Sequence, residues 1–324
     1  MENNWLTLFG SSVLLLLAEL GYFKIASRFN IIDKPNERSS HVHHTIRGGG
    51  VIFVFGILIW FYLSNGQWPW FVLASVIIAI ISFLDDVTSL NVAARFFFQV
   101  LAVALIFYQM WPTHWSIYLL LVAGVVCVGT MNAFNFMDGI NGITGVYALV
   151  MVMTFAYINQ FKIHFTDNSL LLIITTSLLI FLFFNFRKQA SCFAGDVGSV
   201  TIALVLIFLL LQLIRATHNF LWPLLFLVYG TDSIITIIYR LKRRENIFQA
   251  HRTHLFQYLS NELKIPHLVV ASGYGIVQAM VNIIIVICFE AENYALCVAI
   301  ALMFVTAYGF IRMKVVNRIS QTSA

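Results

Sequence analysis

Long apolar runs alternate with short polar segments along almost the whole chain. A helix that crosses a bilayer needs about 20 mostly apolar residues. Eleven runs reach or approach that length, near 5–23, 49–64, 68–84, 94–111, 115–134, 142–159, 169–185, 198–214, 221–239, 268–288 and 294–311. The pattern predicts an all-α, polytopic integral membrane protein with about 11 transmembrane helices and its two ends on opposite sides.

Basic residues predict which side is which. Of the 19 Lys and Arg residues, all but Lys162 and Arg215 fall in segments on one side of the predicted membrane. Cytoplasmic loops are enriched in these residues, so we place the N-terminus outside and the C-terminus in the cytoplasm. The predicted cytoplasmic loops lie near 24–48, 85–94, 135–141, 186–197 and 240–267.

Composition agrees with this interpretation. Hydrophobic residues make up 60% of the 324 residues and charged residues 10%, whereas soluble domains have about 25% charged residues. The four cysteines form no CxxC pair, so we expect small buried hydrophobic side chains rather than a zinc site or a disulfide. Glu19 interrupts the first run, and we expect its carboxyl to reach back to the inner interface.

Aspartates gather on the predicted inner side, where they end, precede or interrupt four different runs: Asp85, Asp86, Asp138, Asp196 and Asp232. A charge at the centre of a bilayer costs about 2.5–3.5 kcal/mol, so a purely structural bundle would avoid them. Adjacent carboxylates repel, and the Asp85-Asp86 pair therefore indicates a bound cation or a retained proton. For Asp232, simple neutralisation by Arg240, Lys242 or Arg243 is an equal alternative.

Other polar residues of the inner loops have side chains that suit a nucleotide or a phosphate. Guanidinium groups such as those of Arg38 and Arg47 fit phosphate oxygens, and Gly48 and Gly49 allow backbone to approach a ligand closely. Asn132, Asn135 and Asp138 recur every three residues on one helical face, an array that can hydrogen-bond a uracil or ribose edge. Asn141 continues the same spacing. Glycine triplets and lone amides are more commonly structural, so each signal alone is weak.

Two further motifs suit a diphosphate. Asp196 lies between Gly195 and Gly198 at the start of a run, and Mg²⁺ favours one or two carboxylates together with substrate phosphates. His251, Arg252 and His254 lie in the most basic loop, where a clamp on a diphosphate is the interpretation we favour over a structural role.

In this order, the motifs resemble those of the polyprenyl-phosphate N-acetylhexosamine-1-phosphate transferases, a glycosyltransferase family 4 group related to the muramoyl-pentapeptide transferases. The resemblance covers about 33–260 and rests on Asp33-x-Pro35-x-x-Arg38, Arg47–Gly50, Asp85-Asp86, Asn135-x-x-Asp138-Gly139, Gly195-Asp196-x-Gly198 and His251-Arg252-x-His254. It implies that 1–324 form a single transmembrane catalytic domain of the bacterial inner (plasma) membrane. That domain would transfer a sugar 1-phosphate from a UDP-N-acetylhexosamine to undecaprenyl phosphate at the cytoplasmic face, releasing UMP.

The resemblance also implies roles for individual residues. Asp196 and Asp86 would ligate Mg²⁺, with Mn²⁺ as a substitute, and the base acting on the lipid phosphate would come from the Asp85-Asp86 pair. The expected catalytic residues are Asp85, Asp86, Asp138, Asp196, His251 and His254. The expected substrate-binding residues are Arg38, Arg47, Gly48, Gly49, Asn132, Asn135, Asn141 and Arg252. We expect no nucleic-acid partner, and assembly as a homodimer is an open alternative.

Two departures from the family pattern narrow the interpretation. Asn141 stands where many relatives have Asp, so it cannot be an ionised base. His251-Arg252-Thr253-His254 replaces the consecutive histidines of the muramoyl branch, which favours the hexosamine branch, and the first loop is similar to those of enzymes that start O-antigens. The alternatives are a muramoyl-pentapeptide-type phosphotransferase and a secondary transporter of an anionic metabolite, which would have paired halves. The sugar is not identified.

Overall fold

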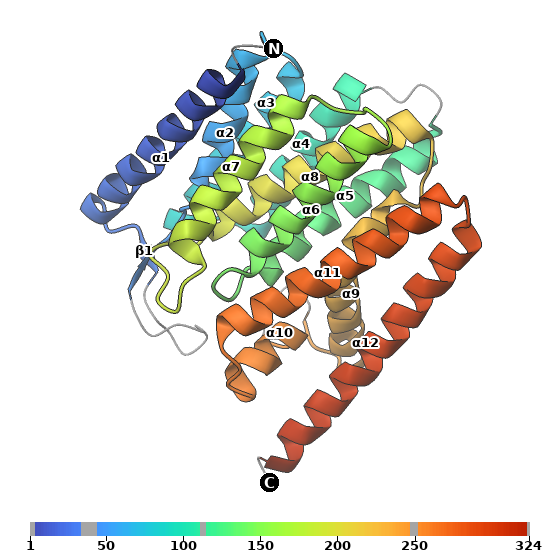
Figure 1. Ribbon diagram of the computed structural model, residues 1–324. Helices are drawn as coiled ribbons and strands as arrows, with labels where there is room; N and C mark the ends of the chain where they lie inside the picture. Colours follow the sequence, from blue (N-terminus) through green and yellow to red (C-terminus); the bar gives the residue numbers. More distant parts are fainter. Residues whose placement is uncertain (1–3, 34–43, 111–114, 247–251, 323–324) are drawn as a thin grey trace.

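The computed structural model describes residues 4–33, 44–110, 115–246 and 252–322, and almost all of this part of the chain is helical (Figure 1). The first half comprises α1 (Asn4–Arg28), β1 (Ile32–Asp33), β2 (Thr45–Ile46), α2 (Val51–Leu63), α3 (Pro69–Thr88), α4 (Val92–Met110), α5 (Ile117–Met137) and α6 (Ile143–Phe161). The second half comprises α7 (Asn168–Asn185), α8 (Gly195–Thr217), the 3₁₀ helix η1 (Trp222–Phe226), α9 (Leu227–Lys242), α10 (Leu255–Gln257), the π-helical turn η2 (Tyr258–Glu262), α11 (His267–Glu290) and α12 (Tyr294–Thr322).

Each predicted apolar run is helical, with η1 and α9 together forming the run near 221–239. Ten helical segments of the described chain are long and apolar enough to cross a membrane, which confirms an all-α polytopic protein. The eleventh run, α2, has 13 residues and covers about 20 Å at 1.5 Å per residue. A bilayer core is about 30 Å thick, so the chain on either side of α2 must cover the difference.

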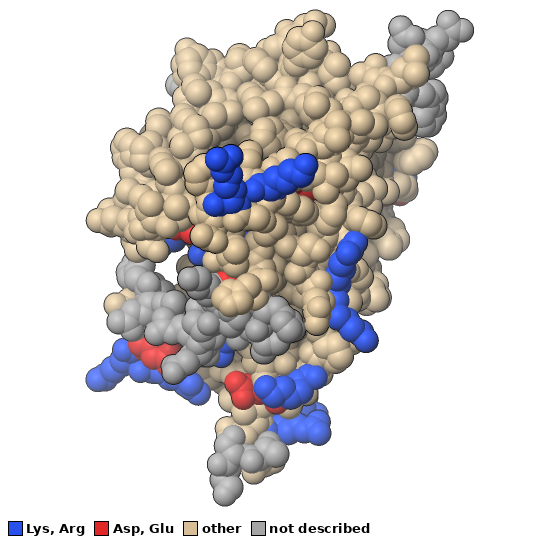
Figure 2. Space-filling model, turned by 90° about the vertical axis from the view of Figure 1, so that its left-hand side faces the viewer, with Lys and Arg blue, Asp and Glu red and all other residues tan. Residues whose placement is uncertain are grey.

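The start of α1 and the end of α12 lie on opposite sides of the bundle, as an odd number of crossings requires (Figure 1). Charged side chains are also unevenly distributed. In the view of Figure 2 the upper part of the surface is free of Lys, Arg, Asp and Glu, and these residues appear from mid-height towards the end where the C-terminus lies. The cytoplasmic orientation of that end stays a prediction.

Helix α8 forms the centre of the bundle. Every residue from Val197 to Ile214 is buried, because α8 packs against α2, α3, α5 and α6. A sequence that is apolar on every face, apart from Ser199, Thr201 and Gln212, suits this position, since a helix that is hydrophobic all round has no face for water. By contrast, α1, α4 and α12 lie at the periphery, with 22%, 22% and 17% of their spanning segments buried.

Several helices extend further than the apolar runs that predicted them. Asp85 and Asp86 lie in the last turns of α3, Asn135 in the last turn of α5, and Asp196 in the first turn of α8. We placed these residues in loops or at the ends of runs. The helices continue past the apolar sequence because these polar side chains face protein rather than lipid, so no hydrophobic residue is needed to extend them.

The prediction for Glu19 was wrong, whereas the expected burial of the cysteines is confirmed. Glu19 does not reach the interface: it is fully buried on α1, with Oε1 3.8 Å from the Cys192 Sγ. Its face of α1 packs against the polar turns that form the site, so the carboxyl is enclosed by protein. All four cysteines, Cys127, Cys192, Cys288 and Cys297, are free thiols and buried.

Candidate active site

Asp86 holds the beginning of α8. Its Oδ1 accepts a hydrogen bond from the Asp196 N–H (2.9 Å), and its Oδ2 accepts one from the Val197 N–H (3.1 Å). The first N–H groups of a helix have no partner within the helix, so Asp86 satisfies two of them from a different helix. Its side chain has no exposed surface, and Oδ1 also lies 2.7 Å from Arg47 Nε. Both oxygens are therefore fully engaged.

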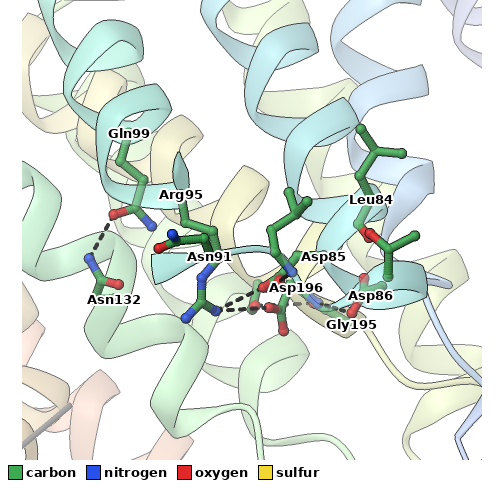
Figure 3. Close-up of polar contacts among 12 residues, drawn as sticks. Leu84, Asp85, Asp86, Asn91, Arg95, Gln99, Asn132, Gly195 and Asp196 are labelled. Atoms are coloured by element: carbon green, nitrogen blue, oxygen red, sulfur yellow. Dashed lines mark hydrogen bonds and ion pairs between the residues drawn. The ribbon is translucent and has the colours of Figure 1, made fainter. Parts of the chain in front are cut away.

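Asp85 stabilises the turn between α3 and α4. Its Oδ1 accepts from the Leu90 N–H (2.6 Å), and its Oδ2 accepts from Arg95 Nη1 (2.8 Å). Arg95 lies one turn into α4 and was absent from our predicted site. A detectable signal was its spacing: Asn91, Arg95 and Gln99 follow one another every four residues and line one face of α4 (Figure 3).

Asp196 is the most accessible carboxylate of the cluster, with 21% of its side chain exposed. Arg47 Nη2 lies 3.7 Å from Asp196 Oδ1, and Arg95 Nη1 lies 3.8 Å from Asp196 Oδ2. Arg95 Nη1 also lies 2.8 Å from Asp85 Oδ2, so one guanidinium group joins the carboxyls of Asp85 and Asp196. Figure 3 shows Asp196 beside the Asp85-Asp86 pair, with Arg95 reaching towards it. The structure therefore brings together three of the predicted acids.

The turn that carries Arg47 is attached to the segment before α8 by backbone hydrogen bonds. The Gly49 N–H donates to the Phe193 carbonyl (2.8 Å), and the Gly50 N–H donates to the Ala194 carbonyl (3.1 Å). Glycine is required at position 50, because a Cβ there would overlap the backbone of Gly198 on α8. Gly48 and Gly49 therefore lie at the site, where they bring Arg47 over Asp86.

The charge environment of Arg47 favours its ionised form. Burial opposes the charge, but Asp86 and Asp196 outweigh it and raise the pKa of Arg47 further above its usual value. Tyr22 of α1 donates a hydrogen bond to the Arg47 carbonyl (2.5 Å) and so fixes the turn from the other side. We did not single out Tyr22 in the sequence, because a tyrosine inside an apolar run is typical of any membrane helix.

Asp138 follows the last residue of α5, half-buried, and lies within electrostatic range of Asp86 and Arg47. Burial raises the pKa of its carboxyl to about 7, and the negative charge of Asp86 adds to this effect. Asn135 lies within the preceding turn and is also half-buried. The Asp138 carboxyl is thus poised to exchange a proton near neutral pH, as a catalytic acid or base requires.

The two other predicted amides are engaged in contacts between segments. Asn132 Nδ2 donates to Gln99 Oε1 and to the Val128 carbonyl, both at 2.8 Å (Figure 3). Asn141 Nδ2 donates to the Arg187 carbonyl (2.8 Å), which holds the loop between α7 and α8. These side chains shape the walls of the site in this structure; whether they also contact substrate stays a prediction.

His254 belongs to a second buried polar cluster. Its Nδ1 lies 3.0 Å from Asp232 Oδ1, and Tyr274 donates to Asp232 Oδ2 (2.8 Å). Asp232 is therefore not neutralised by Arg240, Lys242 or Arg243, the partners we considered. It lies 3.9 Å from Arg312 Nη1 and orients His254. The two clusters adjoin, because Phe256 packs so closely on Gly139 that a Cβ there would lie 2.9 Å from its ring.

Three predicted residues remain to be placed. Arg252 is half-buried in the segment that leads to His254. Arg38 and His251 lie outside the described residues, so their predicted contacts stay predictions.

The chemistry of the acidic cluster suits a divalent ion shared with a substrate. Two neighbouring carboxyls such as Asp85 and Asp196 share a proton or a cation. Among the described residues, however, no three His, Cys, Asp or Glu side chains are grouped as a complete metal site. An ion bound here would thus take its remaining ligands from water or phosphate oxygens, as Mg²⁺ usually does.

Comparisons with known proteins match the same region. The model of the glycosyl transferase family 4 matches residues 68–214, which include Asp85, Asp86, Asp138 and Asp196. A probable undecaprenyl-phosphate N-acetylglucosaminyl 1-phosphate transferase of Bacillus subtilis is 25% identical over 260 residues, 73% of this chain and 71% of the relative. The undecaprenyl-phosphate alpha-N-acetylglucosaminyl 1-phosphate transferase of Yersinia pestis is 26% identical over 284 residues, 80% of this chain and 75% of the relative.

A more distant branch matches a shorter stretch. The phospho-N-acetylmuramoyl-pentapeptide-transferase of Streptococcus equi is 29% identical over 180 residues, 48% of this chain and 52% of the relative. The longer matches thus carry the names of hexosamine 1-phosphate transferases. Over the part that carries the acidic cluster, this chain is thus similar to the polyprenyl-phosphate N-acetylglucosamine 1-phosphate transferases of glycosyl transferase family 4.

Proposed function

We propose that this protein transfers an N-acetylhexosamine 1-phosphate, or its deoxy form, from a UDP-sugar to undecaprenyl phosphate and releases UMP. The reaction would take place at the cytoplasmic face of a bacterial inner membrane and would start a lipid-linked surface polysaccharide such as an O-antigen. One observation supports this most directly. Carboxylates of α3 and α8 meet two arginines at one end of a membrane bundle, where a lipid phosphate and a soluble nucleotide can both arrive.

The reaction must bring two anions together. In the proposed step, an oxygen of the lipid phosphate attacks the sugar-linked phosphorus of the UDP-sugar. The bond from that phosphorus to the bridging oxygen breaks, and UMP leaves with the bridging oxygen. Positioning and electrostatic stabilisation supply most of the catalysis in phosphoryl transfer. Arg47 and Arg95, which already lie within 4 Å of Asp196, would bind the phosphate oxygens.

We propose that Asp196 and Asp85 hold Mg²⁺, for which Mn²⁺ is the expected substitute. The ion would neutralise the diphosphate. Asp85 replaces Asp86 in this role, because the Asp86 side chain has no exposed surface and accepts three hydrogen bonds, whereas the Asp85 side chain is 7% exposed and shares Arg95 with Asp196. Asp86 acts in this scheme by positioning the start of α8. Asp138, whose pKa is near neutral, is the proposed acid or base, and Arg252 and His254 are the proposed contacts to the diphosphate.

A direct transfer assay tests the proposal. Purified protein is incubated with undecaprenyl phosphate, Mg²⁺ and one UDP-N-acetylhexosamine at a time, and the lipid product is identified by its mass. We expect UMP release that requires both the lipid and the metal ion, and that EDTA abolishes. UMP release without lipid would contradict direct attack and favour a covalent intermediate.

Matched variants separate the site from the rest of the molecule. Asp196→Asn should lower transfer at least about 100-fold, since single electrostatic groups in active sites commonly contribute 10²–10³. Glu290→Gln makes the same change of charge on α11, where Glu290 pairs with Lys162 at 2.7 Å, and should retain wild-type transfer. Transfer by Asp196→Asn at the wild-type rate would overturn the assignment. Assembly as a homodimer stays a prediction.

A further inference from the structure

A basic pocket lies between α9, η2 and α12, apart from the acidic cluster. Its lining includes Tyr239, Arg240, Arg243, Tyr258 and Arg312. Arg240 is 5% exposed and Arg312 is 2% exposed. Arginine is rarely buried unless it is paired, so the partners of these guanidinium groups indicate what the pocket is built for.

Arg312 is held rigidly from the protein side. Its Nη1 donates to Thr236 Oγ1 and its Nη2 donates to the Thr253 carbonyl, both at 2.6 Å. Its Nε has no hydrogen-bond partner among the described residues. The rings of Tyr239 and Tyr258 lie 5.3 and 5.8 Å from the guanidinium carbon, close enough for cation–π attraction. Nη1 also lies 3.9 Å from the buried Asp232 Oδ1, which balances part of the charge, and the Nε N–H is left for a further acceptor.

The rest of the lining adds positive charge. Arg240 pairs with Glu245, the acid of the lining, at 3.1 Å. Arg243 is exposed, with its guanidinium carbon 5.9 Å from the Tyr239 ring. Because Glu245 pairs with Arg240 and the buried Asp232 pairs with Arg312, the charge left for a ligand comes from Arg243, which has no carboxylate partner among the described residues. Its planar guanidinium group matches the geometry of phosphate oxygens.

Apolar side chains place the pocket at the edge of the membrane. Ile238 and Leu241 of α9 are 45% and 55% exposed, and Phe310 and Met313 of α12 are 54% and 45% exposed. Ile238 and Leu241 lie near the end of the candidate span Trp222–Lys242, and Phe310 and Met313 flank Arg312 within the candidate span Tyr294–Gln321. Lipid-facing residues beside arginines are typical of the headgroup level.

We propose that this pocket binds the phosphate group of an anionic phospholipid. The same phosphate chemistry could be supplied by a soluble phosphate, but the exposed apolar neighbours favour a lipid with its chains along α9 and α12. The site is linked to the second polar cluster, because Arg312 holds the Thr253 carbonyl between Arg252 and His254. A bound headgroup would thus steady the segment that carries His254, a consequence that rests on the proposed function.

Lipid binding is tested without reference to catalysis. The protein is placed in phosphatidylcholine nanodiscs, phosphatidylglycerol is added in steps, and bound lipid is counted by native mass spectrometry. We expect one saturable phosphatidylglycerol molecule and about fivefold weaker binding in Arg243→Gln, because a basic residue near an anionic headgroup contributes about a factor of five. Arg244→Gln is the matched control: it removes the same charge one residue away, outside the lining, and should change binding less than twofold.

Two further arms identify the source of the phosphate and the link to transfer. If inorganic phosphate binds in a way that depends on Arg243 and phosphatidylglycerol does not bind, the pocket is an anion site for a soluble phosphate and the proposed lipid is excluded. If phosphatidylglycerol accelerates transfer by the wild type but not by Arg243→Gln, the link to His254 is supported. If Arg243→Gln and Arg244→Gln weaken phosphatidylglycerol binding equally, or if neither weakens it, the proposed binding site is refuted. Saturable binding in a protein without transfer activity would instead refute the proposed function alone.

Discussion

Replacing Asp86 by Asn tests whether this carboxylate holds the active site together. Asn keeps the shape but loses the charge, and its NH₂ group would face a backbone N–H of α8. At least one charge-assisted hydrogen bond is lost, which is worth about 1.5–3 kcal/mol. The ion pair with Arg47, whose side chain is 36% exposed, adds no more than about 1 kcal/mol because solvent screens it. We expect the free energy of unfolding to fall by about 3 kcal/mol.

The buried cysteines supply the assay. All four thiols are inaccessible in the folded protein, so a thiol-reactive fluorophore reports unfolding in detergent as the temperature rises. A loss of about 3 kcal/mol should lower the melting temperature by roughly 5–10 °C for a protein of this size. Transfer should fall as well, because the start of α8 carries Asp196.

Asp196→Asn is the comparison that separates an effect on stability from an effect on transfer. Its ion-pair distances are longer, 3.7 and 3.8 Å, and its side chain is partly exposed, so we expect a change of less than about 1 kcal/mol in unfolding together with the loss of transfer. A wild-type melting temperature for Asp86→Asn would refute the proposed helix-holding role. Equal destabilisation of the two variants would refute the distinction between a positioning carboxylate and a reacting one.

Two other predictions follow from close packing and from protonation. In Gly50→Ala the new Cβ would overlap the Gly198 backbone, so we expect a loss of about 1–3 kcal/mol and slower transfer, whereas Gly273→Ala, with nothing within 4 Å, should melt at or above the wild-type temperature. The Asp138 carboxyl has a folded pKa of about 7 against 3.8 when unperturbed, so the wild type loses stability as the pH rises from about 4 to 7. At pH 8 the free energy of unfolding of Asp138→Asn should therefore exceed that of the wild type, by at most about 4 kcal/mol, and its melting temperature should be higher. This difference in stability should shrink as the pH falls towards 4; a difference that does not change with pH would contradict the reasoning.

The helices were predictable because apolar length is a strong signal in a membrane protein, and each predicted run is a helix. The ends of the helices were less predictable. Asp85, Asp86 and Asp196 lie within helical turns because buried protein, rather than lipid, surrounds them, and hydropathy does not distinguish a polar residue in water from one facing a neighbouring helix.

The contacts within the site could not be predicted from the sequence either. Asp85 and Asp86 are adjacent and chemically identical, but one faces the α4 turn and the other the start of α8. Only the packing of α3 between α4 and α8 makes this difference. Arg95 and Asp232 were overlooked or left undecided for the same reason, since their partners are 10 and 22 residues away in sequence.

The enclosure of α8 has a consequence for how the enzyme responds to its membrane. A helix that touches lipid tilts or shifts when the bilayer becomes thicker or thinner. Helix α8 is surrounded by other helices along its whole spanning length, so changes in acyl-chain length reach it only through the helices packed around it, such as α2, α3, α5 and α6. The depth of Asp196 is thus set by the protein and not by the lipid, which would keep the reacting groups in register across membranes of different composition.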